Sequence, residues 1–311
     1  MEGVLNEVLV TEIEAGATEM ARRAGEILQA HFGRPLEVEY KDKEKQDPVT
    51  SVDKESHTYL CEAISRQFPE HGILSEESSP DEMEAPAADF LWVLDPLDGT
   101  TNFLNGLPIY AVSIGVLHRG ALLAAALFIP WPGEKGGCVL HARRGNGTWL
   151  DGERLSIPQT EGPQANRLTG LPASFGAQFR LRKGLRHRVG EVRMTGSIVY
   201  ELAMTTRGIC QYVVFGGPRI WDVAAGALIV MEAGGTVLVR RRRGRRWESL
   251  TSLGPSWKSG PPSLKKLRNW SASLIAGNNQ IAPFVAANLR SRFHLRARVA
   301  RLLRRLRRRR R

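Results

Sequence analysis

The 311-residue sequence has few cysteines and no long apolar run. Its three cysteines, Cys61, Cys138 and Cys210, stand far apart without CxxC or Cys/His spacing, which argues against a disulfide framework or a structural zinc site. No run of 18 apolar residues occurs, and the first residues include several glutamates where a secretion signal would be basic and then apolar. These absences favour a soluble protein of a reducing compartment, which we expect to be the cytoplasm.

Acidic residues are missing from the C-terminal stretch 290–311, which contains 12 arginines. The remaining 32 Lys and Arg equal the 32 Asp and Glu of the chain, so the high pI belongs to this tail. Leucine and valine recur at helical spacing between residues 295 and 306. The tail is therefore either a basic amphipathic helix suited to nucleic acid or an anionic membrane, or a disordered charged extension.

No GxxxxGK[ST] phosphate loop and no internal repeat are visible, so a nucleoside triphosphatase loses its main support. Apolar spacing predicts helices within 4–32 and over 56–68, about 197–207 and 222–233. Apolar runs predict strands at 90–95, 109–117, 121–129, 210–215, 236–239 and 271–276. The segment 240–269, which includes the basic run Arg240–Arg246, reads as an irregular insertion.

Alternating helices and strands predict a layered α/β architecture. A break rich in Pro, Gln and Gly at 158–165 suggests a domain boundary. We expect an N-terminal α+β domain over 1–157, a C-terminal α/β domain over 158–285 and the Arg-rich tail over 286–311.

One stretch, LDPLDGTTNF at 94–103, places two carboxylates at the end of an apolar strand. Pro96 should end the strand with the Asp95 side chain at its tip, and Asp98 follows one turn later. Gly99 permits a sharp bend, and a helix that begins at Thr100 would direct free N–H groups at an anion. Such hard oxygen ligands beside a phosphate site suit Mg²⁺.

A simple Asx-turn with a helix cap would explain two such carboxylates equally well. Asp47, Glu76, Glu77 and Asp222 favour a site, because each also ends an apolar or turn segment. Thr50 and Asp53 are interpreted as helix-capping residues and are left out of the catalytic set.

Four blocks carry a resemblance to a known family: DPVTSVD (47–53), LSEES (74–78), WVLDPLDGTTNF (92–103) and WDVAAGALIVMEAGG (221–235). They resemble those of the inositol monophosphatase family of Mg²⁺-dependent, lithium-sensitive phosphatases over roughly 5–285. The resemblance implies a five-layer αβαβα sandwich of the inositol monophosphatase and fructose-1,6-bisphosphatase type, a homodimer, and phosphomonoester hydrolysis by a water activated by two to three Mg²⁺ ions.

The resemblance also implies roles for single residues. The implied metal ligands are Glu76, Asp95, the carbonyl of Leu97, Asp98 and Asp222. Asp47 and Thr100 would orient and deprotonate the attacking water with help from Glu76. Asp98, Gly99, Thr100, Gly196, Ser197, Ile198, Phe215 and Asp222 would contact the substrate.

The alcohol portion of the substrate is left open. Inositol-type members of the family have a Glu seven residues before the Asp of Trp-Asp, and this chain has Phe215 there, which cannot accept hydrogen bonds from ring hydroxyls. An inositol-1-phosphate-like or related sugar or polyol phosphate is one possible substrate class. Histidinol phosphate, fructose bisphosphate and 3′-phosphonucleotides are alternatives, and Arg219 would either contact a second anionic group or form an internal salt bridge.

A rival hypothesis from another functional class is a protein that keeps the phosphatase fold and binds RNA or a transcription complex through Arg290–Arg311. Peripheral attachment to an anionic membrane through the same tail is a third hypothesis. Salt dependence separates the rival from the leading hypothesis, because contacts to a phosphate backbone weaken steeply with added salt.

Overall fold

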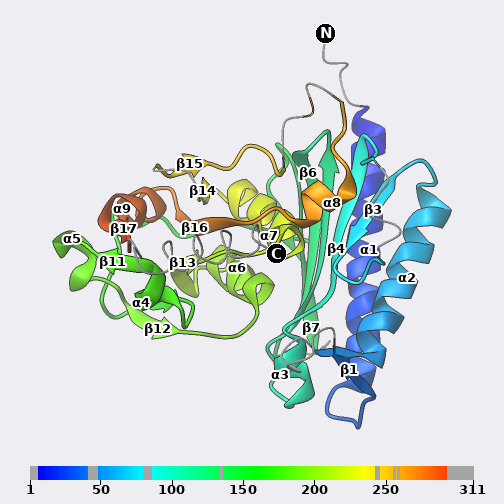
Figure 1. The fold of residues 1–311 in the computed structure, drawn as a ribbon, viewed down its shortest axis with the longest axis horizontal. Coiled ribbons are helices and arrows are strands. Elements are labelled where there is room, and N and C mark those ends of the chain that lie inside the picture. The colour runs from blue at the N-terminus through cyan, green and yellow to red at the C-terminus, as the bar shows by residue number, and fades with distance from the viewer. Residues whose placement is uncertain are drawn as a thin grey trace, which may run out of the picture.

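The computed structural model describes residues 6–40, 48–79, 86–133, 136–241, 246–254, 257 and 260–292. Its elements stack as helix, sheet, helix, sheet, helix, the five layers that run from right to left in Figure 1. This is the layered α/β architecture that the sequence predicts. None of the described helices is long and apolar enough to cross a membrane.

Two long helices form the outer layer of the first half. They are α1 (Glu7–His31) and α2 (Ser51–Gln67). The N-cap Thr50 accepts the N–H of Asp53 at its Oγ1, and the Asp53 carboxylate accepts the N–H of Thr50, which is a capping box. The predicted capping role of these two residues is confirmed, and α2 begins five residues before the predicted start at Ser56.

The first sheet has seven strands in the order β3-β4-β5-β6-β7-β8-β9. These are Gly72–Ser75, Phe90–Asp98, Ala111–His118, Ala121–Pro130, Gly137–Arg143, Thr148–Leu150 and Glu153–Leu155. Only β3 and β4 are parallel, and the other pairs are antiparallel. The predicted strands in this half therefore exist, with small shifts at their ends.

Strand β4 is longer than predicted. It continues through Pro96 to Asp98, and its register against β5 shifts between Asp95 and Asp98. Proline has no N–H to donate to a ladder, so it is tolerated at such an irregularity. The expectation that Pro96 would end the strand was wrong, and Asp95 and Asp98 both belong to β4.

Strands β5 and β6 are buried along almost their whole length, because α1 covers one face of the sheet and α7 (Ile220–Glu232) the other. A Cβ atom on Gly115 of β5 would lie only 2.6 Å from the Cβ of Ala224. The Ser113 hydroxyl of the same strand donates to the carbonyl of Trp221 (3.0 Å). This close approach fixes the N-terminal turn of α7 against the first sheet.

The second sheet has six strands in the order β12-β10-β13-β16-β14-β15. These are Glu191–Arg193, Leu168–Gly170, Cys210–Phe215, Ala272–Asn278, Gly235–Arg241 and Glu248–Ser249. Helices α6 (Ile198–Thr206) and α7 lie between the two sheets. The outer layer of this half contains α4 (Phe175–Gln178), α5 (Lys183–Arg186) and α9 (Ile281–Asn288).

Segment 240–269 differs from the predicted irregular insertion. Arg240 and Arg241 end β14, and α8 (Leu264–Arg268) lies beside β3 and β4 in Figure 1. The side chains of Leu250, Leu253, Leu264 and Leu267 are buried in the largest core cluster. These four leucines make the segment part of the core. The sequence did not reveal this, because the Pro, Ser and Gly residues between them are typical of an irregular loop.

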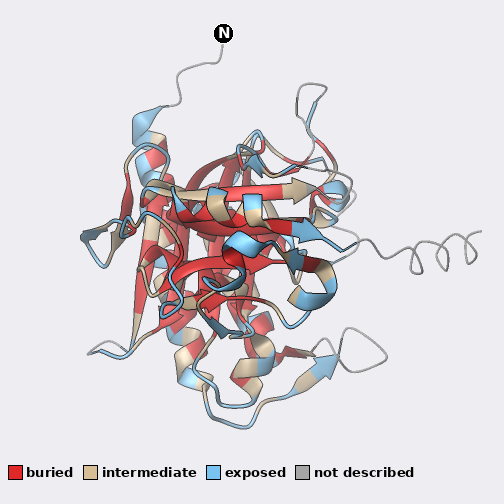
Figure 2. Ribbon diagram, turned by 90° about the vertical axis from the view of Figure 1, so that its left-hand side faces the viewer, coloured by how far each residue is buried: buried red, intermediate tan, exposed pale blue. Residues whose placement is uncertain are grey.

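Three short pieces complete the fold. They are the pairs β1 (Val38–Tyr40) with β2 (Pro48–Thr50) and β11 (Phe179–Leu181) with β17 (Leu289–Ser291), and the helix α3 (Thr100–Leu104). Figure 2 shows the buried sheets and central helices in red beneath an exposed rim. The largest core cluster contains residues of both sheets, so the two halves share an interior.

Candidate active site

The end of β4 supplies two carboxylates and a carbonyl. Asp95 is almost fully buried, and its Oδ1 accepts the N–H of Leu97 (3.2 Å). The Leu97 carbonyl in turn accepts the hydroxyl of Thr100 (3.1 Å). These short-range bonds lie at the irregularity of β4, and Asp95, Leu97 and Asp98 all line one cavity.

The turn into α3 requires glycine. Gly99 has φ of +89°, and a Cβ there would lie 2.9 Å from the carbonyl oxygen of Ile109. Only glycine adopts this conformation without strain. The turn at Gly99 lets α3 begin at Thr100, directly after Asp98. The Thr100 hydroxyl also lies 3.2 Å from Oδ1 of Asp53, whose Oδ2 caps α2.

Asp98 joins the two halves of the molecule. Its Oδ2 accepts the hydroxyl of Ser197 (2.5 Å) and the N–H of Val199 (2.7 Å), both at the start of α6. Ser197 is also the N-cap of that helix and accepts the N–H of Tyr200 (3.1 Å). Ser197, which the resemblance assigned to the substrate side, therefore also holds a predicted metal ligand.

Asp222 comes from the second half, in the first turn of α7. Its Oδ2 accepts the N–H of Arg219 (2.7 Å), and Trp221 beside it is almost completely buried. A carboxylate in the first helical turn is stabilised by the free N–H groups there. The helix thus directs Asp222 toward the end of β4.

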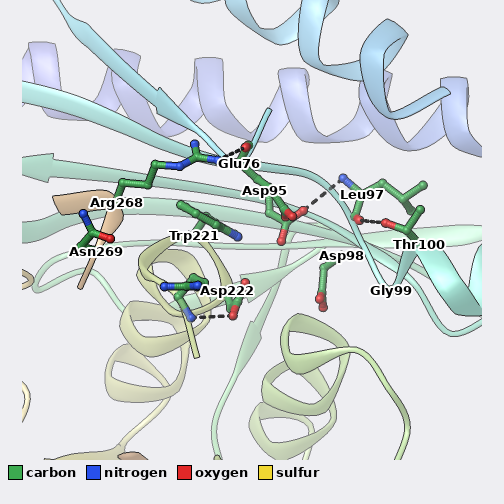
Figure 3. Close-up of a pocket in the computed structure, with 11 residues that line it drawn as sticks. Glu76, Asp95, Leu97, Asp98, Gly99, Thr100, Trp221, Asp222, Arg268 and Asn269 are labelled. Carbon is green, nitrogen blue, oxygen red and sulfur yellow. Dashed lines mark hydrogen bonds between the residues drawn. The ribbon is translucent and has the colours of Figure 1, made fainter. Parts of the chain in front are cut away.

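These groups line one cavity of about 370 Å³. It is lined by Glu76, Asp95, Leu97, Asp98, Gly99, Thr100, Arg219, Trp221, Asp222, Arg268 and Asn269. Figure 3 shows the four carboxylates approaching from β3, β4 and α7. Every metal ligand implied by the resemblance lies here, although the three segments that supply these ligands are separated in the sequence.

Burial and mutual repulsion disfavour the charged forms of these acids. Burial, and then the charge of Glu76, raise the pKa of Asp95 well above its ordinary value. Burial raises the pKa of Asp98 to about 7, although the bonds from Ser197 and Val199 lower it. Burial, and then the charge of Asp98, also raise the pKa of Asp222 well above its ordinary value. The neighbouring groups of the chain therefore do not fully offset the negative charge of these carboxylates.

The donor set fits a hard divalent cation. Carboxylate oxygens and a carbonyl oxygen are the ligands that Mg²⁺ takes in proteins, and a cation would offset the repulsion just described. Within the described residues, however, no three His, Cys, Asp or Glu side chains already form a ready metal site. Oxygens of Asp98 and Asp222 bond to N–H and O–H groups of the chain. These bonds use Oδ2 of each carboxylate.

A second cavity of about 490 Å³ adjoins the first and shares Asp222 with it. Gly196, Ser197, Ile198 and Phe215, the predicted contacts to the alcohol portion, all line it. Much of its remaining wall comes from Pro172, Met194 and Gly216 to Pro218. The predicted residues thus divide between two adjoining spaces, one acidic and one that combines apolar side chains with Ser174, Gln178 and Glu201.

Sequence reasoning missed three residues of this region. Asp53 was interpreted only as a cap, yet it also contacts Thr100. Arg268 and Asn269 line the acidic cavity from the segment taken for an irregular insertion. Asp47, the predicted partner of Thr100, lies outside the described residues. The DPVTSVD block contains both aspartates, so the block itself was the available signal for Asp53.

The sequence pattern of the inositol monophosphatase family matches residues 9–272, which include every residue that lines the acidic cavity. The chain belongs to the inositol monophosphatase family. The Nus factor SuhB of Escherichia coli K12 is 36% identical over 231 residues, which cover 71% of this chain and 82% of SuhB. The fructose-1,6-bisphosphatase/inositol-1-monophosphatase of Aquifex aeolicus is 29% identical over 220 residues, which cover 69% and 81%.

Two solved structures have the same fold. The extragenic suppressor protein suhB of Bartonella henselae superimposes with a TM-score of 0.66 at 26% identity, covering 89% of this chain and 97% of its own. The inositol monophosphatase of Anabaena gives a TM-score of 0.64 at 25% identity, covering 90% and 95%. The predicted family and fold class are confirmed.

Proposed function

We propose that this chain is a Mg²⁺-dependent phosphomonoesterase that hydrolyses a small phosphate ester in the acidic cavity. The observation that carries this proposal is the meeting of Glu76, Asp95, Asp98 and Asp222 in one space beside the turn Gly99-Thr100. Clustered carboxylates that repel one another favour a site for cations. The family assignment supports the same reaction class.

Glu76, Asp95, Asp98, Asp222 and the Leu97 carbonyl would hold the ions. When bound, Mg²⁺ supplies positive charge that polarises the phosphate and acidifies a water molecule. The chain itself excludes bulk water with Trp221 and orients the phosphate with the N–H groups that follow Gly99. The number of ions, two to three, and inhibition by Li⁺ are parts of the proposal.

Thr100 and Asp53 would prepare the attacking water. The Thr100 hydroxyl lies at the edge of the cavity, and Asp53 Oδ1 lies 3.2 Å behind it, so a proton taken up at Thr100 can pass to the carboxylate. We therefore give Asp53 the role that the sequence resemblance gave to Asp47. The capping box holds Asp53 in place for this role.

The adjoining cavity favours an alcohol portion with few hydroxyl groups. Phe215 lines this cavity and is largely buried in the core, and its side chain cannot accept the hydrogen bonds by which a polyol would be recognised. Ile198 and Met194 add further apolar residues to the wall. Ser174 and Gln178 offer polar groups at the same cavity. We propose that esters of less hydroxylated alcohols react better than inositol phosphates.

The test is hydrolysis of a panel of phosphate monoesters by the purified full chain, with Mg²⁺, with Mg²⁺ and Li⁺, and with chelator. The panel includes inositol 1-phosphate, fructose 1,6-bisphosphate, histidinol phosphate, a 3′-phosphonucleotide and an aryl phosphate. Turnover that needs Mg²⁺ and falls with Li⁺ is expected. Absence of Mg²⁺-dependent turnover on every ester would refute the proposal. Light scattering of the same sample tests the proposed homodimer.

A second candidate function, binding of a nucleic-acid backbone, rests on a separate surface. The exposed cations of this basic face are Arg180, Arg182, Lys183, Arg186, Arg188, Arg290 and Arg292. Arg180 and Arg290 lie directly opposite each other on β11 and β17, where like charges repel. No Asp or Glu occurs at 162–190 or after Glu248. The relatives named Nus factor SuhB also favour a partner of this kind.

In the sequence, Arg290 and Arg292 are followed by the rest of the Arg-rich tail, whose residues 293–311 lie outside the described part of the chain. RNA binding that weakens steeply between low and high salt is expected, and replacing Arg180 and Arg290 by glutamine should weaken it. Matched substitution of Arg22 and Arg23 on α1 is the control. Equal affinities of both double variants would argue against this face, and preference for anionic vesicles over RNA would indicate a membrane instead.

A further inference from the structure

The segment 260–270, which we call the α8 strap, leaves the second half and lies on the first sheet. The N–H of Ala87 donates to the carbonyl of Pro262 (2.9 Å), and Pro86 forms an isolated β-bridge with Ser263. Leu264 and Leu267 are buried in the same core cluster as Leu74 and Leu91 of strands β3 and β4. The strap is therefore anchored by both backbone and side chains where it approaches the acidic cavity.

Arg268, the last residue of α8, contacts both halves of the site. Its two terminal nitrogens donate to the carbonyls of Ser75 (3.1 Å) and Glu76 (2.9 Å). Its guanidinium carbon lies 5.1 Å from the centroid of the Trp221 ring, in cation–π contact. Figure 3 shows the side chain reaching past Trp221 to the backbone at Glu76.

Both the N–H and the carbonyl group of Glu76 are held by hydrogen bonds. The N–H of Glu76 donates to the carbonyl of Leu94 (3.0 Å), the residue that precedes Asp95, and the Glu76 carbonyl accepts from Arg268. The Trp221 carbonyl is held by Ser113, and its ring by Arg268. The Arg268 guanidinium thus connects the backbone of Glu76 to Trp221, the residue that precedes Asp222.

We propose that Arg268 is a positioning residue, which sets the separation of Glu76 and Asp222 and thereby the affinity of the site for divalent cations. This inference rests on the proposed Mg²⁺-dependent hydrolysis. It concerns the α8 strap, to whose residues the family resemblance assigned no role. Groups that orient metal ligands from behind typically change metal affinity about 10- to 100-fold when they are removed.

The chemistry requires arginine. A guanidinium presents parallel N–H groups in a rigid plane, which suits two neighbouring carbonyls and the face of an indole at once. A lysine ammonium would keep the charge but not this fork. Charge alone therefore predicts full rescue by lysine, whereas positioning predicts little rescue.

The experiment compares Arg268→Ala and Arg268→Lys with the wild-type full chain. The control is Lys266→Ala, which removes an exposed cation from the same helix. Titration calorimetry with Mg²⁺, and Mn²⁺ binding followed by electron paramagnetic resonance, measure cation affinity without turnover. Melting in chelator measures stability, and hydrolysis is recorded against Mg²⁺ concentration.

About a 10-fold weaker Mg²⁺ affinity is expected for Arg268→Ala, with kcat largely recovered at high Mg²⁺. Arg268→Lys should still bind Mg²⁺ clearly more weakly than the wild type. The control Lys266→Ala should bind Mg²⁺ as tightly as the wild type. Wild-type Mg²⁺ affinity in Arg268→Ala, or full rescue by lysine, would overturn the inference. A lower melting temperature with unchanged affinity would also overturn it, because the role would then be structural. Failure of the wild type to bind Mg²⁺ would instead count against the proposed function.

Discussion

The two adjoining cavities differ in how their walls are built. The acidic cavity takes its carboxylates from β3, β4 and α7, and several of them are held by backbone groups. The cavity beside it has Phe215, Ile198 and Met194 in its wall. Carboxylates are thus concentrated where the phosphate would react, whereas the cavity for the alcohol combines this apolar surface with Ser174, Gln178 and Glu201. The reaction class follows from the first cavity, and substrate preference depends on the second.

Removing charge from the acidic cavity should have the largest effect on activity. Asp95→Asn should lower kcat about 1,000-fold or more, since Asp95 is the acid most deeply placed among the others. The fold should persist, because a neutral amide relieves repulsion from the other acids. Steady-state kinetics with Mg²⁺ and melting in chelator measure both effects.

For Asp95→Asn, the substitution Glu153→Gln on the exposed strand β9 is the control and should leave kcat unchanged. More than about a tenth of wild-type kcat in Asp95→Asn would remove the basis of the hydrolysis proposal.

A smaller loss is expected at the second aspartate of the DPVTSVD block. Asp53→Asn keeps a helix-capping side chain but cannot accept a proton, so kcat should fall about 100-fold. Asp47→Asn is the matched variant and should reduce kcat far less. Measuring kcat for the two variants decides between the aspartate that Thr100 contacts and the one that the sequence favoured. The reverse order of effects would restore the original assignment.

The contrast between these aspartates shows what the sequence can and cannot predict. Asp95, Asp98, Gly99 and Thr100 were predicted together because they lie in one stretch whose turn chemistry is local. The contact between Asp53 and Thr100 joins residues 47 positions apart, and that of Arg268 with Glu76 joins residues 192 positions apart. Neither leaves a periodic signal in the chain.

The prediction of helices and strands was limited in the same way, by contacts between residues that are distant in the sequence. Long amphipathic helices and apolar strands were predicted to within a few residues, because hydrophobic spacing records which face is buried. The strap was mistaken for an irregular insertion, since its few buried leucines are spread among Pro, Ser and Gly. Its place on the first sheet depends on contacts with strands that are distant in the sequence.

Substitution in the second cavity should have a moderate effect, which is confined to the choice of substrate. Phe215→Gln introduces a neutral acceptor and donor of similar length, so kcat/KM for a polyol phosphate should rise about 10-fold relative to an aryl phosphate. The Mg²⁺ dependence should not change, because Phe215 does not line the acidic cavity. The ratio of the two kcat/KM values is the measurement. An unchanged ratio, in a variant that melts as wild type does, would show that Phe215 does not select the alcohol.

The smallest expected effect is on stability, and it distinguishes the acidic cavity by its pH dependence. Burial raises the pKa of Asp98 to about 7 in the folded chain, and it also raises the pKa of Asp95 and Asp222. In the unfolded chain these carboxyls ionise near pH 4. As pH rises from about 4 toward 7 and above, the unfolded state loses these protons first, so the folded state loses stability relative to it.

In chelator, the melting temperature should therefore fall by a few degrees between pH 5 and pH 8. Added Mg²⁺ should raise it more at pH 8 than at pH 5, since the ion binds the ionised carboxylates and must displace protons at low pH. Asp98→Asn should flatten the decline in chelator, while Glu153→Gln should not. A melting temperature in chelator that rises from pH 5 to pH 8 would mean that the carboxylates are already compensated within the chain, and that a cation is not needed to hold them together.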